Sequence, residues 1–211
     1  MARGGSVIFP FSLFTFSPFV LYLLPLIFNI LFISGCDIFQ TRTPQQPQQE
    51  QSGFIPATTP DQVITNLENA IETESADNYL SCLSDPATGG RAFSFVPSSD
   101  VVQQFLSLNW NRNSEYTYFK DLVAQSSKSA TPVLTLSSQS PFQPLGSSND
   151  SVLFSANYVL QWPNNMYPQQ VQGSLQLHLG HNTGGIWSIY LWIDSQTDSL
   201  TWSDLKVRAI Q

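Results

Sequence analysis

The sequence predicts an α+β domain in which N-terminal helices pack on one face of a curved antiparallel sheet of about four long strands. Two observations predict this class. Apolar residues recur at helical spacing between Thr59 and Leu122, and after Ser126 they alternate with polar residues instead. Helices followed by a run of strands are typical of α+β domains rather than of alternating α/β folds.

The first predicted helix begins at a clear N-terminal signal. Thr59 is placed as the N-cap, Pro60 occupies the first helical position, and Gln62 completes a capping box. The apolar residues that follow mark one buried face at helical spacing: Val63, Ile64, Leu67, Ala70 and Ile71.

Further helical segments follow as far as residue 122. Residues 75–77 begin a short helix that Asp85-Pro86 ends, and residues 98–100 are expected to cap the next one. Residues 92–96 alternate and predict a short strand, and residues 110–122 are expected to form a further helical turn or two. The side chains expected to face inward are Tyr79, Leu80, Cys82, Leu83, Val101, Val102, Phe105, Leu106, Tyr116, Phe119 and Leu122.

The long strands are predicted in the second half of the chain, over residues 132–138, 151–162, 170–179 and 186–194. The last strand is apolar on both faces, with Tyr190 and Trp192 expected on the same face, so it belongs in the middle of the sheet. Residues 199–206 form a capped turn that folds Trp202 and Leu205 back onto the domain.

Composition excludes several classes of function. The chain carries a formal charge of −7 and has a pI near 4.5, so it is a poor partner for nucleic acid, which is bound through Lys and Arg. His178 and His181 have no neighbouring ligands of metal-site geometry, and both are expected to be ordinary surface histidines. There is no Gly-x-Ser-x-Gly and no Walker-type phosphate loop. The sequence therefore predicts neither a metal nor a cofactor.

Residues 1–35 have the anatomy of a signal peptide, with Arg3 near the start, a long apolar body and small residues before the expected cut. The tetrapeptide Ile33-Ser34-Gly35-Cys36 has the lipobox pattern of bacterial lipoproteins. It predicts that Cys36 is acylated, that it becomes the first residue of the mature protein, and that the lipid bilayer is its partner.

Two alternatives to this interpretation stay open. The apolar run over residues 7–33 is long enough for an uncleaved membrane anchor, and ordinary secretion is the other alternative. The lipobox favours the lipoprotein, and thus a membrane-anchored place in the bacterial cell envelope. Asp37 follows the cysteine, and inner and outer membrane are both left open.

Residues 36–58 are expected to form the lipidated cysteine and a disordered tether, because residues 40–58 are rich in Gln and Pro and offer little to bury. A Pro-rich docking motif is the alternative, but the PxxP at residues 44–47 has Arg42 as its single basic neighbour. With Cys36 acylated, Cys82 has no partner and is expected to be a buried free thiol.

The order of these elements resembles the nuclear transport factor 2-like superfamily, the cone-shaped fold of ketosteroid isomerase-type proteins, and in particular exported lipoproteins of that group. The phrases that carry the resemblance are residues 59–67, 77–83, 187–194 and 200–206. It extends over about residues 59–208 of the domain predicted at residues 59–211, and it implies a conical cavity between sheet and helices. Members of the superfamily use this cavity for catalysis, for binding or for dimer contacts.

Enzymes on this fold need polar groups inside the cavity, and the sequence offers few. Asp194 is expected to cap the turn after its strand, and Tyr158 to pack its ring and find a backbone partner. If the large aromatic residues line the open end of the cone, they suit an apolar or aromatic-stacking ligand. The predicted ligand-binding residues are Tyr158, Trp162, Tyr190 and Trp192. Packing of these residues against the helices or a dimer partner is the alternative.

The function predicted is therefore that of a membrane-tethered binding or protein-interaction module without an evident catalytic set. Its candidate partners are a small apolar ligand, an envelope protein or a second copy of the chain. An envelope enzyme of the isomerase or dehydratase type, using the cone cavity, is one alternative. A purely structural role in the envelope or in secretion machinery is the other.

Overall fold

The computed structural model describes residues 54–138, 142–147 and 149–210. The chain divides into two units, Met1–Gln48 and Gln49–Gln211, and every described residue belongs to the second. The predicted signal peptide, Cys36 and most of the predicted tether thus lie outside the described residues. Within the described part, no helix has both the length and the apolar character needed to cross a membrane.

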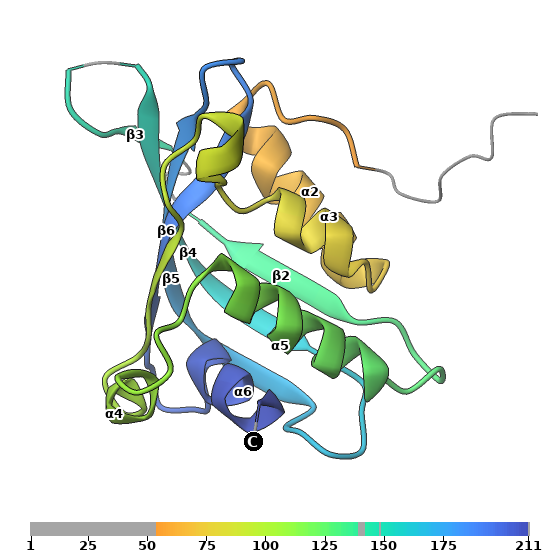
Figure 1. Cartoon of the computed structure of the whole chain (residues 1–211). Coiled ribbons are helices and arrows are strands. Elements are labelled where there is room, and N and C mark those ends of the chain that lie inside the picture. The colour runs from red at the N-terminus through yellow and green to blue at the C-terminus, as the bar shows by residue number, and fades with distance from the viewer. Residues whose placement is uncertain (1–53, 139–141, 148, 211) are drawn as a thin grey trace, which may run out of the picture. The chain divides into compact units, whose positions relative to one another are not determined.

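The described residues form one mixed sheet of six strands (Figure 1). The strand order is β1 (Ser94–Val96), β6 (Trp187–Ser195), β5 (Gln170–His181), β4 (Ser151–Gln161) and β2 (Val133–Ser137), and β3 (Gln143–Pro144) also pairs with β4. The four predicted long strands are confirmed, with the two-faced strand β6 inside the sheet. The sheet is not wholly antiparallel as predicted, because β1 runs parallel to β6.

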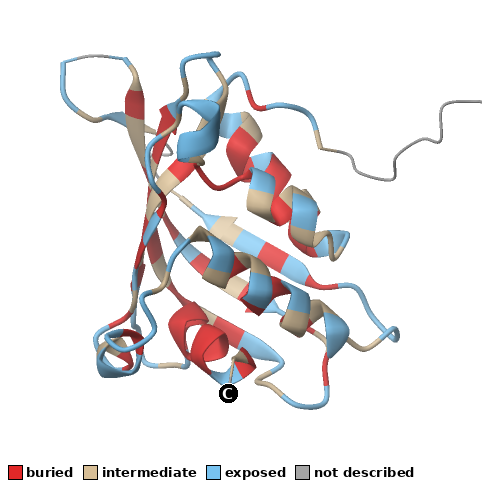
Figure 2. Cartoon of the chain, viewed as in Figure 1, coloured by how far each residue is buried: buried red, intermediate tan, exposed pale blue. Residues whose placement is uncertain are grey.

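The main helices lie together on one face of this sheet, and α4 lies at the β1 edge (Figure 1). Residues buried between the helices and the sheet form the core (Figure 2). The helices are α2 (Pro60–Glu72), α3 (Ala76–Ser81), α4 (Val102–Phe105), α5 (Arg112–Ala124) and α6 (Trp202–Ala209), with a 3-10 turn η2 (Pro86–Thr88) between α3 and β1. The α+β class is confirmed.

Helix α2 buries all five residues of its predicted apolar face, but its N-terminus differs from the prediction. Thr59 is the N-cap residue, yet its side chain makes no capping hydrogen bond. The Gln62 side-chain oxygen Oε1 instead accepts a hydrogen bond from the backbone N–H of Thr58 at 3.3 Å.

The cap predicted at residues 98–100 is wrong. Helix α4 starts after Val101, and the Ser98 backbone N–H donates to Ser203 Oγ at 3.0 Å. Leu106, which was predicted to face inward, is 71% exposed.

A β-bulge in β6 corrects the predicted faces of that strand. His178 of β5 pairs with Leu191, and the next residue, Leu179, pairs with Ile189, so Tyr190 is an extra residue without a partner in the ladder. The bulge moves Tyr190 out of alternation. Tyr190 and Trp192 therefore do not share a face.

The domain begins earlier than the predicted boundary at residue 59. Ala57 is buried, and its carbonyl accepts a hydrogen bond from the Trp187 N–H at 2.7 Å. Asn66 of α2 donates through its side chain to the carbonyl of Ile55. The last residues of the predicted tether thus pack as part of the fold.

Candidate functional site

The interior between helices and sheet is filled by large side chains from three elements. Trp192 comes from β6, Trp202 and Lys206 come from α6, and Glu115 comes from α5; each is 0% exposed. Helix α6 lies over the concave side of the sheet and is buried along most of its length (Figure 2). The capping box between Thr201 and Asp204 fixes where this helix begins.

A buried ion pair lies at the centre of this filling. Lys206 Nζ donates to Glu115 Oε1 at 2.6 Å, and neither side chain reaches solvent. The same carboxylate accepts the Trp110 indole N–H at 2.7 Å and the Tyr79 hydroxyl at 2.7 Å. The negative charge of Glu115 is thus compensated within the core by the Lys206 ammonium and by two further hydrogen-bond donors.

Aromatic rings enclose the Lys206 ammonium on its other sides. Its nitrogen lies 3.6 Å from the ring centroid of Phe95 and 4.3 Å from that of Trp192. Such contacts favour a desolvated cation. Burial lowers the pKa of Lys206, and the Glu115 carboxylate opposes that shift.

A second buried polar group joins β4, β6 and the start of α6. The Tyr158 hydroxyl donates to Asp194 Oδ1 at 2.8 Å and accepts the Trp202 backbone N–H at 2.6 Å. Asp194 Oδ2 accepts the backbone N–H of Ser203 at 2.7 Å and its hydroxyl at 2.5 Å. Burial raises the pKa of Asp194, against the lowering effect of the hydrogen bonds from Ser203 and Tyr158.

Asp194 therefore has a different partner from the one predicted. Instead of capping the turn that follows its strand, it binds the first turn of α6. A carboxylate at this position is also stabilised by the helix dipole. Tyr158 does find a backbone partner, as predicted, in the N–H of Trp202. Tyrosine and aspartate within hydrogen-bond reach would suit acid–base chemistry, but here both are buried and bound to α6.

The predicted ligand-binding residues are divided between the two sides of the sheet. Tyr158, Trp162 and Trp192 lie in the core, each at most 1% exposed. Trp162 packs edge-on against Phe119 of α5. Tyr190 lies elsewhere, stacked edge-on against His178 with the Arg91 guanidinium 4.4 Å from its ring centroid.

Glu115 and Lys206 were not predicted as core residues, although the sequence carries a signal for each. Glu115 precedes three buried residues of α5 by three, four and seven positions, namely Tyr118, Phe119 and Leu122, which is the spacing of one helix face. The prediction placed Tyr116 on that face, whereas Tyr116 is half-exposed and binds Asp77. Lys206 likewise follows Trp202 by one helical turn.

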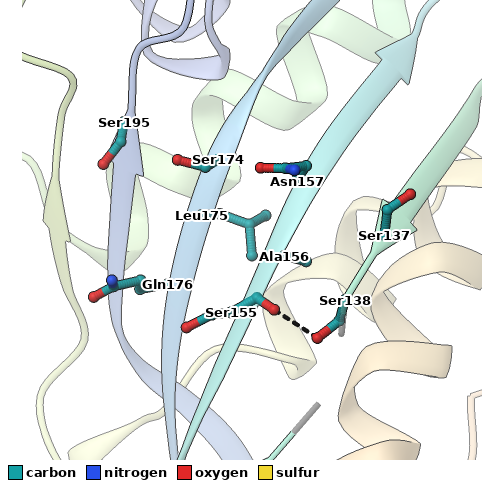
Figure 3. A pocket seen from close by; sticks show the side chains of 9 residues that line it. All are labelled: Ser137, Ser138, Ser155, Ala156, Asn157, Ser174, Leu175, Gln176 and Ser195. Carbon is teal, nitrogen blue, oxygen red and sulfur yellow. Dashed lines mark hydrogen bonds between the residues drawn. The ribbon is translucent and has the colours of Figure 1, made fainter. Parts of the chain in front are cut away.

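A hollow of about 390 Å³ opens on the other face of the sheet. It crosses β2, β4, β5 and β6, and Figure 3 shows short polar side chains around it. Its polar residues are Ser137, Ser138, Ser155, Asn157, Ser174, Gln176 and Ser195. Of the described residues, no group of three or more His, Cys, Asp or Glu is arranged to hold a metal ion.

No protein-family model matches the sequence, and no curated protein matches it. Solved structures do match. A protein of Novosphingobium aromaticivorans, provisionally named an aromatic ring hydroxylase, is 12% identical with a TM-score of 0.48, and the match covers 69% of this chain and 92% of the other. A Streptomyces avermitilis protein, provisionally named a dehydratase of the nuclear transport factor 2-like family, is 13% identical with a TM-score of 0.46 over 64% and 91% of the two chains.

A third match is a Nostoc punctiforme protein of unknown function with a cystatin-like fold, 11% identical with a TM-score of 0.43 over 66% of this chain and 90% of the other. Of these three proteins, the one from Streptomyces avermitilis is named as a member of the nuclear transport factor 2-like family, which is the family that the sequence resembles. The likeness concerns the fold and assigns no substrate to this chain.

Proposed function

We propose that this protein is a non-catalytic binding module of the bacterial cell envelope, held at a membrane by lipid on Cys36. The observation that carries the proposal is that buried side chains fill the space between the helices and the sheet. Catalysis there would need polar groups that a substrate can reach. Glu115 and Lys206 instead bind each other at 2.6 Å with no exposed surface.

The outward face of the sheet is the binding surface in this proposal. Inward residues such as Tyr158 and Asp194 alternate with outward ones such as Asn157 and Ser195. None of the outward-facing residues of β2, β4, β5 and β6 described here is formally charged at pH 7, although the chain as a whole carries −7. Depletion of charge is typical of the central part of an interface.

The alternative, an isomerase or dehydratase, is favoured by one observation, the 2.8 Å hydrogen bond between Tyr158 and Asp194. Against it, the remaining bonding capacity of both groups is occupied by Trp202 and Ser203 of α6. An enzyme using this pair would have to move α6 out of the core in each turnover.

Hydrogen exchange distinguishes these two functions. The backbone amides of Trp202 and Ser203 donate to Tyr158 and Asp194 inside the core. A closed cone predicts that both amides of the full chain exchange as slowly as the central strands, because exchange there requires global unfolding. Exchange much faster than that of β5 would show that α6 opens and would support the enzyme.

The tether is tested by fractionating cells that express the Cys36→Ala variant. The lipobox and the polar residues after it support a lipid anchor, so this variant should move to the soluble fraction while wild type stays with the membrane. Cys82→Ala, which changes a buried thiol, is the matched control and should stay with the membrane. Retention of Cys36→Ala in the membrane would identify residues 7–33 as an anchor instead.

Thiol titration gives an independent measurement. Cys82 is a free thiol, as predicted, is 2% exposed, and has a pKa raised by burial. It should react with a thiol reagent only after denaturation. Acylated Cys36 predicts one reactive thiol per denatured chain, and a count of two would contradict acylation.

A further inference from the structure

The hollow on the outward face of the sheet contains a continuous row of hydrogen-bonding side chains. Ser137 pairs with Asn157, Asn157 with Ser174, and Ser174 with Ser195, so these four residues cross four adjacent strands at the same level. At about 4.8 Å between strands, the row is about 14 Å long. Ser155 and Gln176, which pair with each other, begin a second row beside it.

These side chains have hydrogen-bonding capacity that the described part of the chain leaves unused. The one hydrogen bond seen among the lining residues in Figure 3 runs from the Ser138 hydroxyl to the Ser155 carbonyl oxygen at 2.7 Å. Within the described residues, six side chains around the hollow make no hydrogen bond: Ser137, Ser155, Asn157, Ser174, Gln176 and Ser195. By contrast, the polar groups in the core are almost all paired.

The chemistry of this row selects a class of ligand. Hydroxyl and carboxamide groups each donate and accept, so they match a ligand that presents both functions along its length. The described residues that line the hollow include no Lys or Arg for a phosphate or carboxylate and no acidic group for a cation. A neutral ligand rich in hydroxyl and amide groups fits these properties.

Apolar side chains flank the polar row on the same face. Val159 lies two residues beyond Asn157 on β4, and Ile193 lies two residues before Ser195 on β6; both are half-buried. Sugar rings combine hydroxyl edges with C–H faces, and such apolar flanks can contact the C–H faces while the row binds the hydroxyls.

We infer that this hollow binds a neutral saccharide chain, with Asn157 and Ser174 at its centre. The inference rests on the proposed function as a binding module and adds the class of ligand. A second copy of the chain is the competing occupant, since two copies could approach through an uncharged face without repulsion between their net negative charges.

The test uses the full chain in dodecylphosphocholine micelles, a detergent without a sugar head group, and follows backbone amide chemical shifts. The probe is tri-N-acetylchitotriose. We expect its addition to shift amides of β2, β4, β5 and β6 around the hollow. Asn157→Leu and Ser174→Val should each weaken binding about fivefold or more, as the loss of a hydrogen bond does.

Thr135→Val is the matched control, because Thr135 lies on the same face of β2 but outside the hollow. It should leave the affinity unchanged, and the amide spectrum of each variant reports whether it is folded. Trigalacturonate, an anionic trisaccharide, should bind more weakly than the neutral probe, since the hollow offers no cation.

Several outcomes would overturn the inference. They are no shift with tri-N-acetylchitotriose, shifts confined to another surface, an equal loss in Thr135→Val, or equal binding of trigalacturonate. Shifts at the hollow that depend on protein concentration without sugar would assign it to a second copy. None of these results affects the Cys36→Ala fractionation or the exchange of the α6 amides, so failure of the ligand class and failure of the proposed function are separable.

Discussion

Lys206 Nζ and Glu115 Oε1 lie 2.6 Å apart in the core, and the two residues are 91 positions apart in the chain. The pair joins α5 to α6 where a ligand cavity was expected. Replacing one partner of such a pair leaves the other charge buried without compensation, which costs far more than the pair itself contributes.

Lys206→Met should therefore lower the free energy of unfolding by about 3–5 kcal/mol. Glu115→Gln alone should be similarly destabilising, because the ammonium then lies among aromatic rings without a counter-ion. The double variant should recover much of the loss, and urea unfolding of the four proteins measures this coupling. Additive losses would contradict a coupled pair.

Asp194 predicts a pH dependence of definite sign. Burial raises its pKa above the usual 3.8, so the folded state binds more protons than the unfolded state as the pH falls from neutrality. Its contribution to stability is complete below the unfolded pKa and is lost as the pH rises through the folded pKa. Asp194→Asn lacks this titration. The free energy of unfolding of wild type, relative to that of the variant, should therefore increase as the pH is lowered from about 7 to about 4.

Ser203→Ala provides a matched comparison for Asp194. It removes the hydroxyl that donates to Asp194 Oδ2, a contact that lowers the pKa of the carboxyl. The stabilisation on acidification should therefore start at a higher pH in Ser203→Ala than in wild type. A relative stability of Asp194→Asn that does not change with pH would refute the assignment.

Glu74 lies just after α2 with a positive φ of 53°, a left-handed conformation that costs about 1 kcal/mol outside glycine. Its carboxylate is bound by the Ser126 hydroxyl and lies 2.9 Å from Lys128 Nζ. Glu74→Ala loses these contacts and keeps the strain, whereas Glu74→Gly loses both. In thermal unfolding the glycine variant should be more stable than the alanine variant by about 1 kcal/mol. If the alanine variant is the more stable one, the backbone at Glu74 is not strained.

Lys128→Ala distinguishes the contributions of the two partners of Glu74, Lys128 and Ser126, to stability. The Lys128 side chain is 82% exposed, and an exposed ion pair contributes little, so this variant should lose less than about 1 kcal/mol. A loss as large as that of Glu74→Ala would show that the ion pair, rather than the Ser126 hydroxyl, holds the loop.

The elements whose signals are local could be predicted from the sequence. The thirteen consecutive residues of α2 contain both Pro60 and the apolar residues at helical spacing. Along β5, buried and more exposed residues alternate. The bulge at Tyr190 could not be predicted, because it is defined by the pairing of β6 with β5 and not by β6 alone. The parallel pairing of β1 with β6 joins segments about a hundred residues apart and also leaves no local trace.

The candidate site was harder to predict than the fold for a related reason. Apolar patterning places Trp192 and Trp202 in the core but does not reveal that they meet each other, with ring centroids 4.6 Å apart. Whether the space between helices and sheet is open or filled depends on the combined volume of side chains that come from different elements. Glu115 could not be predicted as a core residue, because charged residues are rarely buried unless they are paired and its partner is on the last helix.

Helix α6 also sets a condition on the timing of folding. Until residue 206 has been synthesised, Glu115 has no cation and Tyr158 and Asp194 have no helix to bind, so a shorter nascent chain cannot close its interior. The domain is thus expected to lack a stable native state until α6 has left the ribosome. If the chain crosses a membrane before it folds, as the proposed lipoprotein would, this delay keeps it in the unfolded form that a translocation channel can accept.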